Sequence, residues 1–299
     1  MKKIIKRLSL LTLTLSFILL FNSTNSFADN INTDTNAIKK NYQQGIEKRK
    51  IDPNKYTFKA FEENYKLGIN TYNNMKNIIE PNLNYNEWFE KVLNFGAFPD
   101  GEGHAPSEKN QKNSQEDNAM KFERDLRKGD IILVEGDPGH AAIATTDNYI
   151  LEMTGGGNIL SWAVTGIENN NHQFSKHNWL WAIEEQGVKK SEPEIGNWLQ
   201  IWRIPDSDMA NKCANYADRT FWNSSGGYHK NKYIDYRVTS GMRTKNPNYC
   251  SKLIFQSYYW GSGDEPVMKP NMINLTWILP WALPNVFLSK YAPYKVGTY

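Results

Sequence analysis

Cysteine is scarce in this 299-residue chain, which contains only Cys213 and Cys250. The sequence also has no CxxC pair and no HExxH segment, which are the usual patterns of zinc sites. Residues 155–157 are three consecutive glycines, but they lack the spacing of a dinucleotide-binding or phosphate-binding loop. We therefore expect no metal and no cofactor.

A hydrophobic run long enough to span a bilayer is missing as well. Residues 8–21 form an apolar run of about 14 residues, whereas a spanning helix needs about 20. Four basic residues precede the run, and Ser26-Phe27-Ala28 follows it with small residues at the positions that signal peptidase recognises. This pattern predicts a signal peptide of residues 1–28, cleaved after Ala28. The mature protein is then secreted or associated with the cell wall, without a membrane span.

An excess of charge of one sign is also missing. The chain has 35 basic and 32 acidic residues, and all four charged residues of the signal peptide are basic. Cleavage leaves 31 basic residues against 32 acidic ones. A nearly neutral chain carries no electrostatic signature of nucleic-acid binding, so we expect no such partner.

The remaining sequence divides into an extension of residues 29–120 and a catalytic domain of residues 121–299. Residues 29–53 are polar, and residues 58–95 show helical spacing of apolar side chains. Residues 98–118 contain glycines and a polar run, which predicts a mobile loop.

The catalytic domain begins with a series of short apolar runs that predict strands and ends with helical patterns. The expected strands are residues 131–135, 140–143, 149–153, 159–164, 179–183 and 198–204. One helix is expected to begin at a cap formed by Ser207 or Asp208, and another covers residues 250–260 and ends at Gly261. The pattern predicts an α+β fold with about six strands.

Cys250 lies at the expected start of the last helix, with Asn246 or Asn248 as its cap. The helix dipole and the free backbone N–H groups there lower a thiol pKa and can bind an oxyanion. Cys250 is therefore a candidate nucleophile. Two other interpretations stay open, a disulfide with Cys213 and a buried inert thiol. Cys213 itself lies on the apolar face of a helical pattern, a position that suits packing.

A thiolate nucleophile needs an imidazole within hydrogen-bonding reach. Of the five histidines, four lie in polar loop or turn segments, whereas His140 opens a strand and precedes two alanines that leave space beside its ring. If residues 144–148 form a five-residue loop, Glu152 on the next strand faces His140 and can fix its tautomer. A two-residue turn at Asp147-Asn148 would instead place Glu152 on the other face. The sequence leaves both registers open.

Several short motifs together resemble the circularly permuted, papain-like amidases of the YaeF/YiiX family, within the NlpC-type cysteine peptidases. They occupy residues 128–133, 139–143, 150–152, 214–217, 249–254 and 279–280, within a stretch of about residues 126–288. The resemblance implies an antiparallel papain-like sheet packed on helices, with the helical extension before it. It also implies a triad of Cys250, His140 and Glu152. Tyr249 and Ser251, next to the nucleophile, are candidate substrate-binding residues.

Three functions follow from these patterns. The first is cleavage of an amide or related acyl bond, with cell-wall peptidoglycan as one candidate substrate. The second keeps the fold but acts as a lipid acyl hydrolase, thioesterase or acyltransferase. The third is a non-catalytic exported binding protein in which Cys213 and Cys250 are joined by a disulfide.

Overall fold

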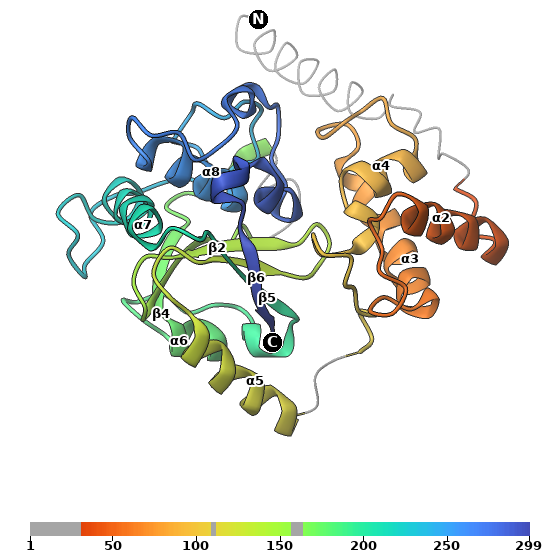
Figure 1. Ribbon diagram of the computed structural model, residues 1–299, viewed down its shortest axis with the longest axis horizontal. Coiled ribbons are helices and arrows are strands. Elements are labelled where there is room, and N and C mark those ends of the chain that lie inside the picture. The colour runs from red at the N-terminus through yellow and green to blue at the C-terminus, as the bar shows by residue number, and fades with distance from the viewer. Residues whose placement is uncertain (1–30, 109–111, 157–163) are drawn as a thin grey trace, which may run out of the picture. The chain divides into compact units, whose positions relative to one another are not determined.

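The computed structural model describes residues 31–108, 112–156 and 164–299 (Figure 1). The predicted signal peptide and nearly all of the strand expected at residues 159–164 lie outside the described residues. The elements below belong to the compact unit of residues 33–299.

A six-stranded sheet forms the centre of this unit, with strand order β4-β3-β2-β1-β5-β6 and every neighbouring pair antiparallel. Its strands are β1 Ile131–Val134, β2 His140–Ala144, β3 Tyr149–Met153, β4 Asn171–Ser175, β5 Leu199–Arg203 and β6 Tyr294–Thr298. The α+β class is therefore confirmed, and so are the strands predicted at β1, β2, β3 and β5.

Helices precede the first strand and lie between later strands of the sequence. The α-helices are α2 Thr35–Glu47, α3 Phe58–Met75, α4 Tyr85–Lys91, α5 Lys112–Asp125, α6 Lys176–Trp181, α7 Ser207–Phe221 and α8 Cys250–Gly261. Short 3-10 helices cover Asn94–Gly96, Glu194–Gly196, Pro270–Asn274, Pro280–Val286 and Ser289–Tyr291.

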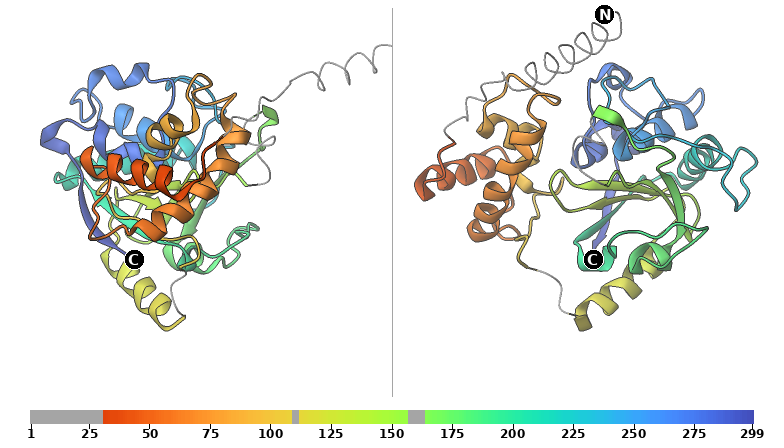
Figure 2. Two further views of the ribbon diagram at one scale, coloured as in Figure 1. Left: turned by 90° about the vertical axis from the view of Figure 1, so that its right-hand side faces the viewer. Right: turned by 180° about the vertical axis from the view of Figure 1, so that it is seen from behind.

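Both faces of the sheet are buried, because strand side chains alternate between two apolar cores. Figures 1 and 2 show α7 and α8 on one side of the sheet, and α5 and α6 on the other. Leu133 and Ile143 pack into the core that contains Leu253 of α8. Ile132 and Ala142 point the other way, into the core of α5 and α6. This alternation explains why the central strands are apolar throughout.

One predicted strand was wrong, and two strands were not predicted. Residues 179–183 were expected to be a strand, but Trp179 and Leu180 belong to α6, where Ser175 accepts a hydrogen bond from the backbone of Asn178 as the cap. Both side chains are fully buried in the core, so the run is apolar for packing and not because it is a strand. Strands β4 and β6 were not predicted. The first has a polar sequence, and the second is only partly buried.

Helix boundaries also differ from the predicted ones. Helix α5 begins inside the segment expected to be a loop, and buried Phe122 anchors it. The cap of α7 is Asp206, whose carboxylate accepts from Met209 N at 2.9 Å. Neither predicted asparagine caps α8. Asn248 instead accepts a hydrogen bond from Tyr249 N and donates one to Gln256.

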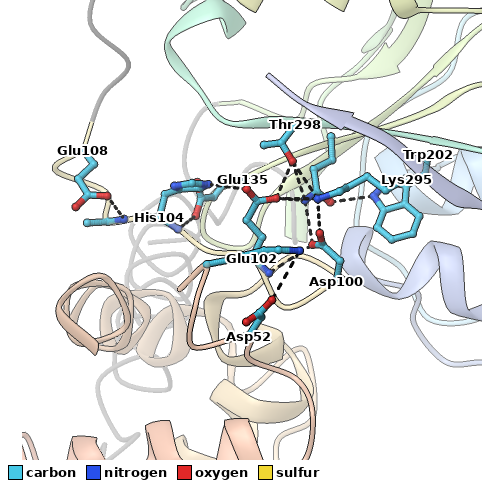
Figure 3. Close-up of polar contacts among 12 residues, drawn as sticks. Asp52, Asp100, Glu102, His104, Glu108, Glu135, Trp202, Lys295 and Thr298 are labelled. Atoms are coloured by element: carbon cyan, nitrogen blue, oxygen red, sulfur yellow. Dashed lines mark hydrogen bonds and ion pairs between the residues drawn. The ribbon is translucent and has the colours of Figure 1, made fainter. Parts of the chain in front are cut away.

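The last strand is held by a cluster of charged groups, shown in Figure 3. Lys295 of β6 forms ion pairs with Asp100 and Glu102, the second at 3.0 Å. Thr298 donates a further hydrogen bond to Glu102 at 2.6 Å. Burial raises the pKa of Glu102, but the nearby ring of His104 and hydrogen bonds from Thr298 and Lys295 outweigh it and lower the pKa. The segment before α5 is thus tied to the end of the chain.

Replacing Lys295 with methionine should lower the free energy of unfolding by about 1–3 kcal/mol, because two largely buried carboxylates lose their cation. Urea denaturation measures the loss. The matched control is Lys290→Met, since Lys290 forms an exposed ion pair with Glu265 and should change stability by about 0.5 kcal/mol or less. Equal effects of the two variants would contradict this interpretation of the cluster.

Candidate active site

The hairpin of β2 and β3 places His140 beside Glu152. Ala142 pairs with Glu152 and Ala144 with Ile150, so the pairing is shifted by two residues from the register expected for a loop of residues 144–148. The direct pairing of His140 with Glu152 was therefore wrong. A shift by two residues keeps side chains on the same face, and His140 Nε2 lies 2.9 Å from Glu152 Oε2 across the diagonal. The expected contact is present in a different register.

Glu152 is fully enclosed by polar partners that the sequence did not reveal. Trp179 Nε1 donates to its Oε2 at 2.7 Å, and Lys190 forms an ion pair with its Oε1. Lys190 also pairs with Glu194 at 3.1 Å. Burial raises the pKa of Glu152, but the charge of Lys190 and the hydrogen bond with His140 outweigh it and lower the pKa. Glu152 is therefore a carboxylate that fixes the orientation of the His140 ring.

Cys250 is the first residue of α8, only 7% exposed, and hydrogen-bonds to His140. Burial raises the pKa of its thiol, but the hydrogen bond and charge of His140, together with the Ser251 backbone, lower it overall. Burial likewise lowers the pKa of His140, but hydrogen bonds with Cys250 and Glu152 raise it to about 10. Because Nε2 faces Glu152, Nδ1 is the nitrogen that serves Cys250. The geometry favours a thiolate beside an imidazolium.

Cys213 lies elsewhere, in the middle of α7, where it is fully buried. Both thiols are free, so the disulfide alternative does not describe this structure. Burial raises the pKa of the Cys213 thiol to about 12. It is a packing residue without nucleophilic character.

A thiol-alkylation experiment separates the two cysteines. Iodoacetamide should modify Cys250 already at about pH 6, below the usual thiol pKa of about 8.5, because His140 stabilises the thiolate. Cys213 should stay unmodified up to about pH 9 in the folded protein, since burial raises its pKa and blocks access. Peptide mapping by mass spectrometry identifies the labelled residue. Labelling of Cys213 at an equal rate would contradict this assignment.

A cavity of about 230 Å³ opens at Cys250 and His140. Its apolar walls are formed by Met75, Ile79, Pro138, Val238, Trp277, Ile278, Leu279 and Pro280. The two candidate substrate-binding residues line it, and their polar groups contact Ile278. Tyr249 Oη accepts from Ile278 N at 3.2 Å, and Ser251 Oγ donates to Ile278 O at 2.7 Å. Both residues thus shape the wall beside the nucleophile.

Tyr236 also belongs to the site and was not predicted. It is buried, lines the cavity, and its hydroxyl hydrogen-bonds to Cys250. Gly155 has φ +65°, and a Cβ there would lie 3.1 Å from the Tyr236 ring, so a glycine leaves room for it. Tyr236 comes from a polar loop without periodicity, which gave no sequence signal.

The family described as "Lipoprotein N-acylation protein LnsA-like" matches residues 104–299, which is more than half of the chain. The chain belongs to this family. The match includes all of residues 126–288, where the resemblance to permuted papain-like amidases lies. The family description names N-acylation, so it points to an acyltransferase type of enzyme.

A relative from Bacillus thuringiensis, described as an uncharacterized 30.3 kDa protein, is 37% identical over 179 residues. The aligned part covers 58% of this chain and 58% of the relative. No solved structure matches. Within the described residues, no helix combines the length and apolar character needed to cross a bilayer.

Proposed function

We propose that this protein is a cysteine acyltransferase that moves an acyl group from an ester donor to an amine acceptor, through a thioester on Cys250. The observation that carries this proposal is the hydrogen-bonded series of Cys250, His140 and Glu152 at the mouth of an apolar cavity. The family to which the chain belongs supports the choice of acyl transfer, and its description suggests a lipoprotein as the source of the amine.

In the first half-reaction, the Cys250 thiolate attacks the ester carbonyl and forms a C–S bond. The C–O bond to the alcohol breaks, and the His140 imidazolium gives its proton to the departing alkoxide. Free backbone N–H groups in the first turn of α8 and the hydroxyl of Tyr236 can stabilise the oxyanion. The apolar walls suit the acyl chain, whose burial there is favourable.

In the second half-reaction, a neutral amine attacks the thioester carbonyl. Neutral His140 takes a proton from the attacking nitrogen, and the C–S bond breaks to release the Cys250 thiolate. An amide forms, and the thiolate and imidazolium are restored. Water in place of the amine would give hydrolysis, the activity of a lipid acyl hydrolase or thioesterase, by the same steps.

The fold fits a circularly permuted papain-like arrangement, which we include in the proposal. The strands that carry His140 and Glu152 precede the helix that begins with Cys250, and α8 packs on this sheet. We likewise propose export through the N-terminal signal peptide, since an exported lipoprotein acceptor would lie on the same side of the membrane.

A transfer assay tests the proposed function. The full chain is incubated with the p-nitrophenyl ester of a long-chain fatty acid and a peptide with a free N-terminal amine, and the fatty amide is measured by mass spectrometry. The amide should form with wild type and with Cys213→Ala, but not with Cys250→Ala. Amide formation that survives Cys250→Ala would refute the mechanism. Release of free fatty acid alone would favour a hydrolase, and cleavage of peptidoglycan fragments would favour the amidase reading.

A further inference from the structure

A second cavity, of about 450 Å³, also reaches His140. It shares His140, Thr154 and Gly156 with the cavity at Cys250, so the two meet at the catalytic imidazole. The remaining walls differ. Val188 and Phe174 are apolar, but most of the other lining residues are charged or polar.

The charges of this second cavity favour a cation. Its carboxylates are those of Glu135, Glu192 and Glu194, and its ammonium groups are those of Lys189 and Lys190. Lys190 already forms ion pairs with Glu194 and with Glu152, which is buried and does not line this cavity. Once the thioester has formed, His140 is neutral because it has given its proton to the leaving alcohol. The remaining carboxylates of Glu135 and Glu192 then outnumber the single remaining cation, which is Lys189.

His172 does not alter this balance. It faces the second cavity from β4, where it pairs with Glu152 in the sheet. Burial, together with the charges of Lys230 and Lys190, lowers the pKa of His172 to about 4, so the ring is neutral at physiological pH. A cationic ligand therefore meets no additional positive charge from it.

We propose that the second cavity binds the acceptor as an ammonium ion beside Glu135 and delivers its amine to the thioester at His140, while the acyl chain occupies the apolar cavity. This inference rests on the proposed function. It assigns one cavity to each substrate, so that the acceptor can enter while the acyl group is still bound. Acceptor and donor then do not compete for space.

Glu135 is well placed for this role. It directly follows Val134, the residue that pairs with His140 across β1 and β2. Its Oε1 accepts a hydrogen bond from His104 N at 3.0 Å, which fixes the carboxylate (Figure 3). Burial raises the pKa of Glu135 to about 7, close to the 7.7–8.0 of an α-amino group. The arriving ammonium can therefore pass one proton to Glu135 and a second to His140 as the C–N bond forms.

Separate measurement of the two half-reactions tests the inference. The release of p-nitrophenol gives the rate of acylation, and the decay of the isolated thioester against amine concentration gives the rate of transfer. Glu135→Gln should reduce transfer to a cationic amine by about tenfold or more, because an ammonium–carboxylate hydrogen bond is lost. Transfer to a neutral nucleophile, such as methanol, should not show this loss. Val188→Trp, which fills the second cavity, should slow transfer both to the cationic amine and to methanol.

Acylation should change less than about threefold in either variant, a factor that corresponds to well under 1.4 kcal/mol. The matched control is Val238→Trp in the apolar cavity, which should slow acylation instead. If the thioester forms but Glu135→Gln and Val188→Trp transfer to a cationic amine as wild type does, the inference is overturned while the proposed function stands. If wild type forms no thioester, the proposed function itself fails, and the inference fails with it.

Discussion

Replacing His140 with alanine should slow the acylation of Cys250 by about 10³-fold, within the range of general acid–base catalysis. Two contributions are lost together. The thiol loses the partner that lowers its pKa, and the leaving alcohol loses its proton donor. A stopped-flow measurement of p-nitrophenol release gives the rate.

The control for this prediction is His177→Ala. His177 is an exposed residue of α6 whose ring contacts Glu123 at 3.0 Å, away from the Cys250 cavity. This variant should acylate at the wild-type rate. A His140→Ala rate within tenfold of wild type would show that the imidazole neither activates Cys250 nor protonates the leaving alcohol, whatever its contact with Cys250.

Replacing Lys190 with methionine should lower the free energy of unfolding by about 3–5 kcal/mol, the usual cost of removing one partner of a buried ion pair. The side chains of Lys190 and Glu152 are 5% and 0% exposed, so water cannot replace the lost cation. We expect acylation to fall as well, because Glu152 would no longer be held as a carboxylate beside His140. Chemical denaturation measures the stability.

A double variant makes this second prediction specific. Lys190→Met combined with Glu152→Gln removes both charges, so it should recover much of the lost stability without recovering the activity. Lys66→Met, which breaks an exposed pair with Glu62, should change stability by about 0.5 kcal/mol or less. If Lys190→Met alone lowered the free energy of unfolding as little as Lys66→Met does, the buried pair of Lys190 and Glu152 would not hold the triad in place.

The pH dependence of the Lys190→Met variant has a definite sign. The partners of Glu152 lower its pKa in the folded protein, so they contribute stability above the unfolded pKa of about 4.3, and this contribution is lost as the pH falls. The variant lacks much of that contribution. The stability difference between wild type and variant should therefore shrink below about pH 4.

The sequence was informative where local chemistry decides the structure. Continuous apolar runs between turns predicted β1, β2, β3 and β5, and a helix start predicted the position of Cys250. The sequence left two registers open for His140 and Glu152. The register that placed both on one face was wrong by two residues, a shift that keeps the side chains on the same face.

Contacts between distant segments could not be predicted in this way. Lys190 lies 38 residues from Glu152 in the chain, and Tyr236 comes from a polar loop. Strand β4 is polar because Asn171 uses its side chain to bind the backbone of Lys232 and Ile234. Tertiary hydrogen bonds, and not local propensity, determine these placements.

Identifying the acylated residue is the most direct test of the claim that Cys250 is the nucleophile. The protein is reacted briefly with the long-chain p-nitrophenyl ester, digested, and mapped by mass spectrometry. We predict one acyl group on the peptide that contains Cys250, attached through a bond that neutral hydroxylamine cleaves. An unmodified Cys250 in a protein that turns over the ester, or an acyl group fixed to another residue, would contradict the account.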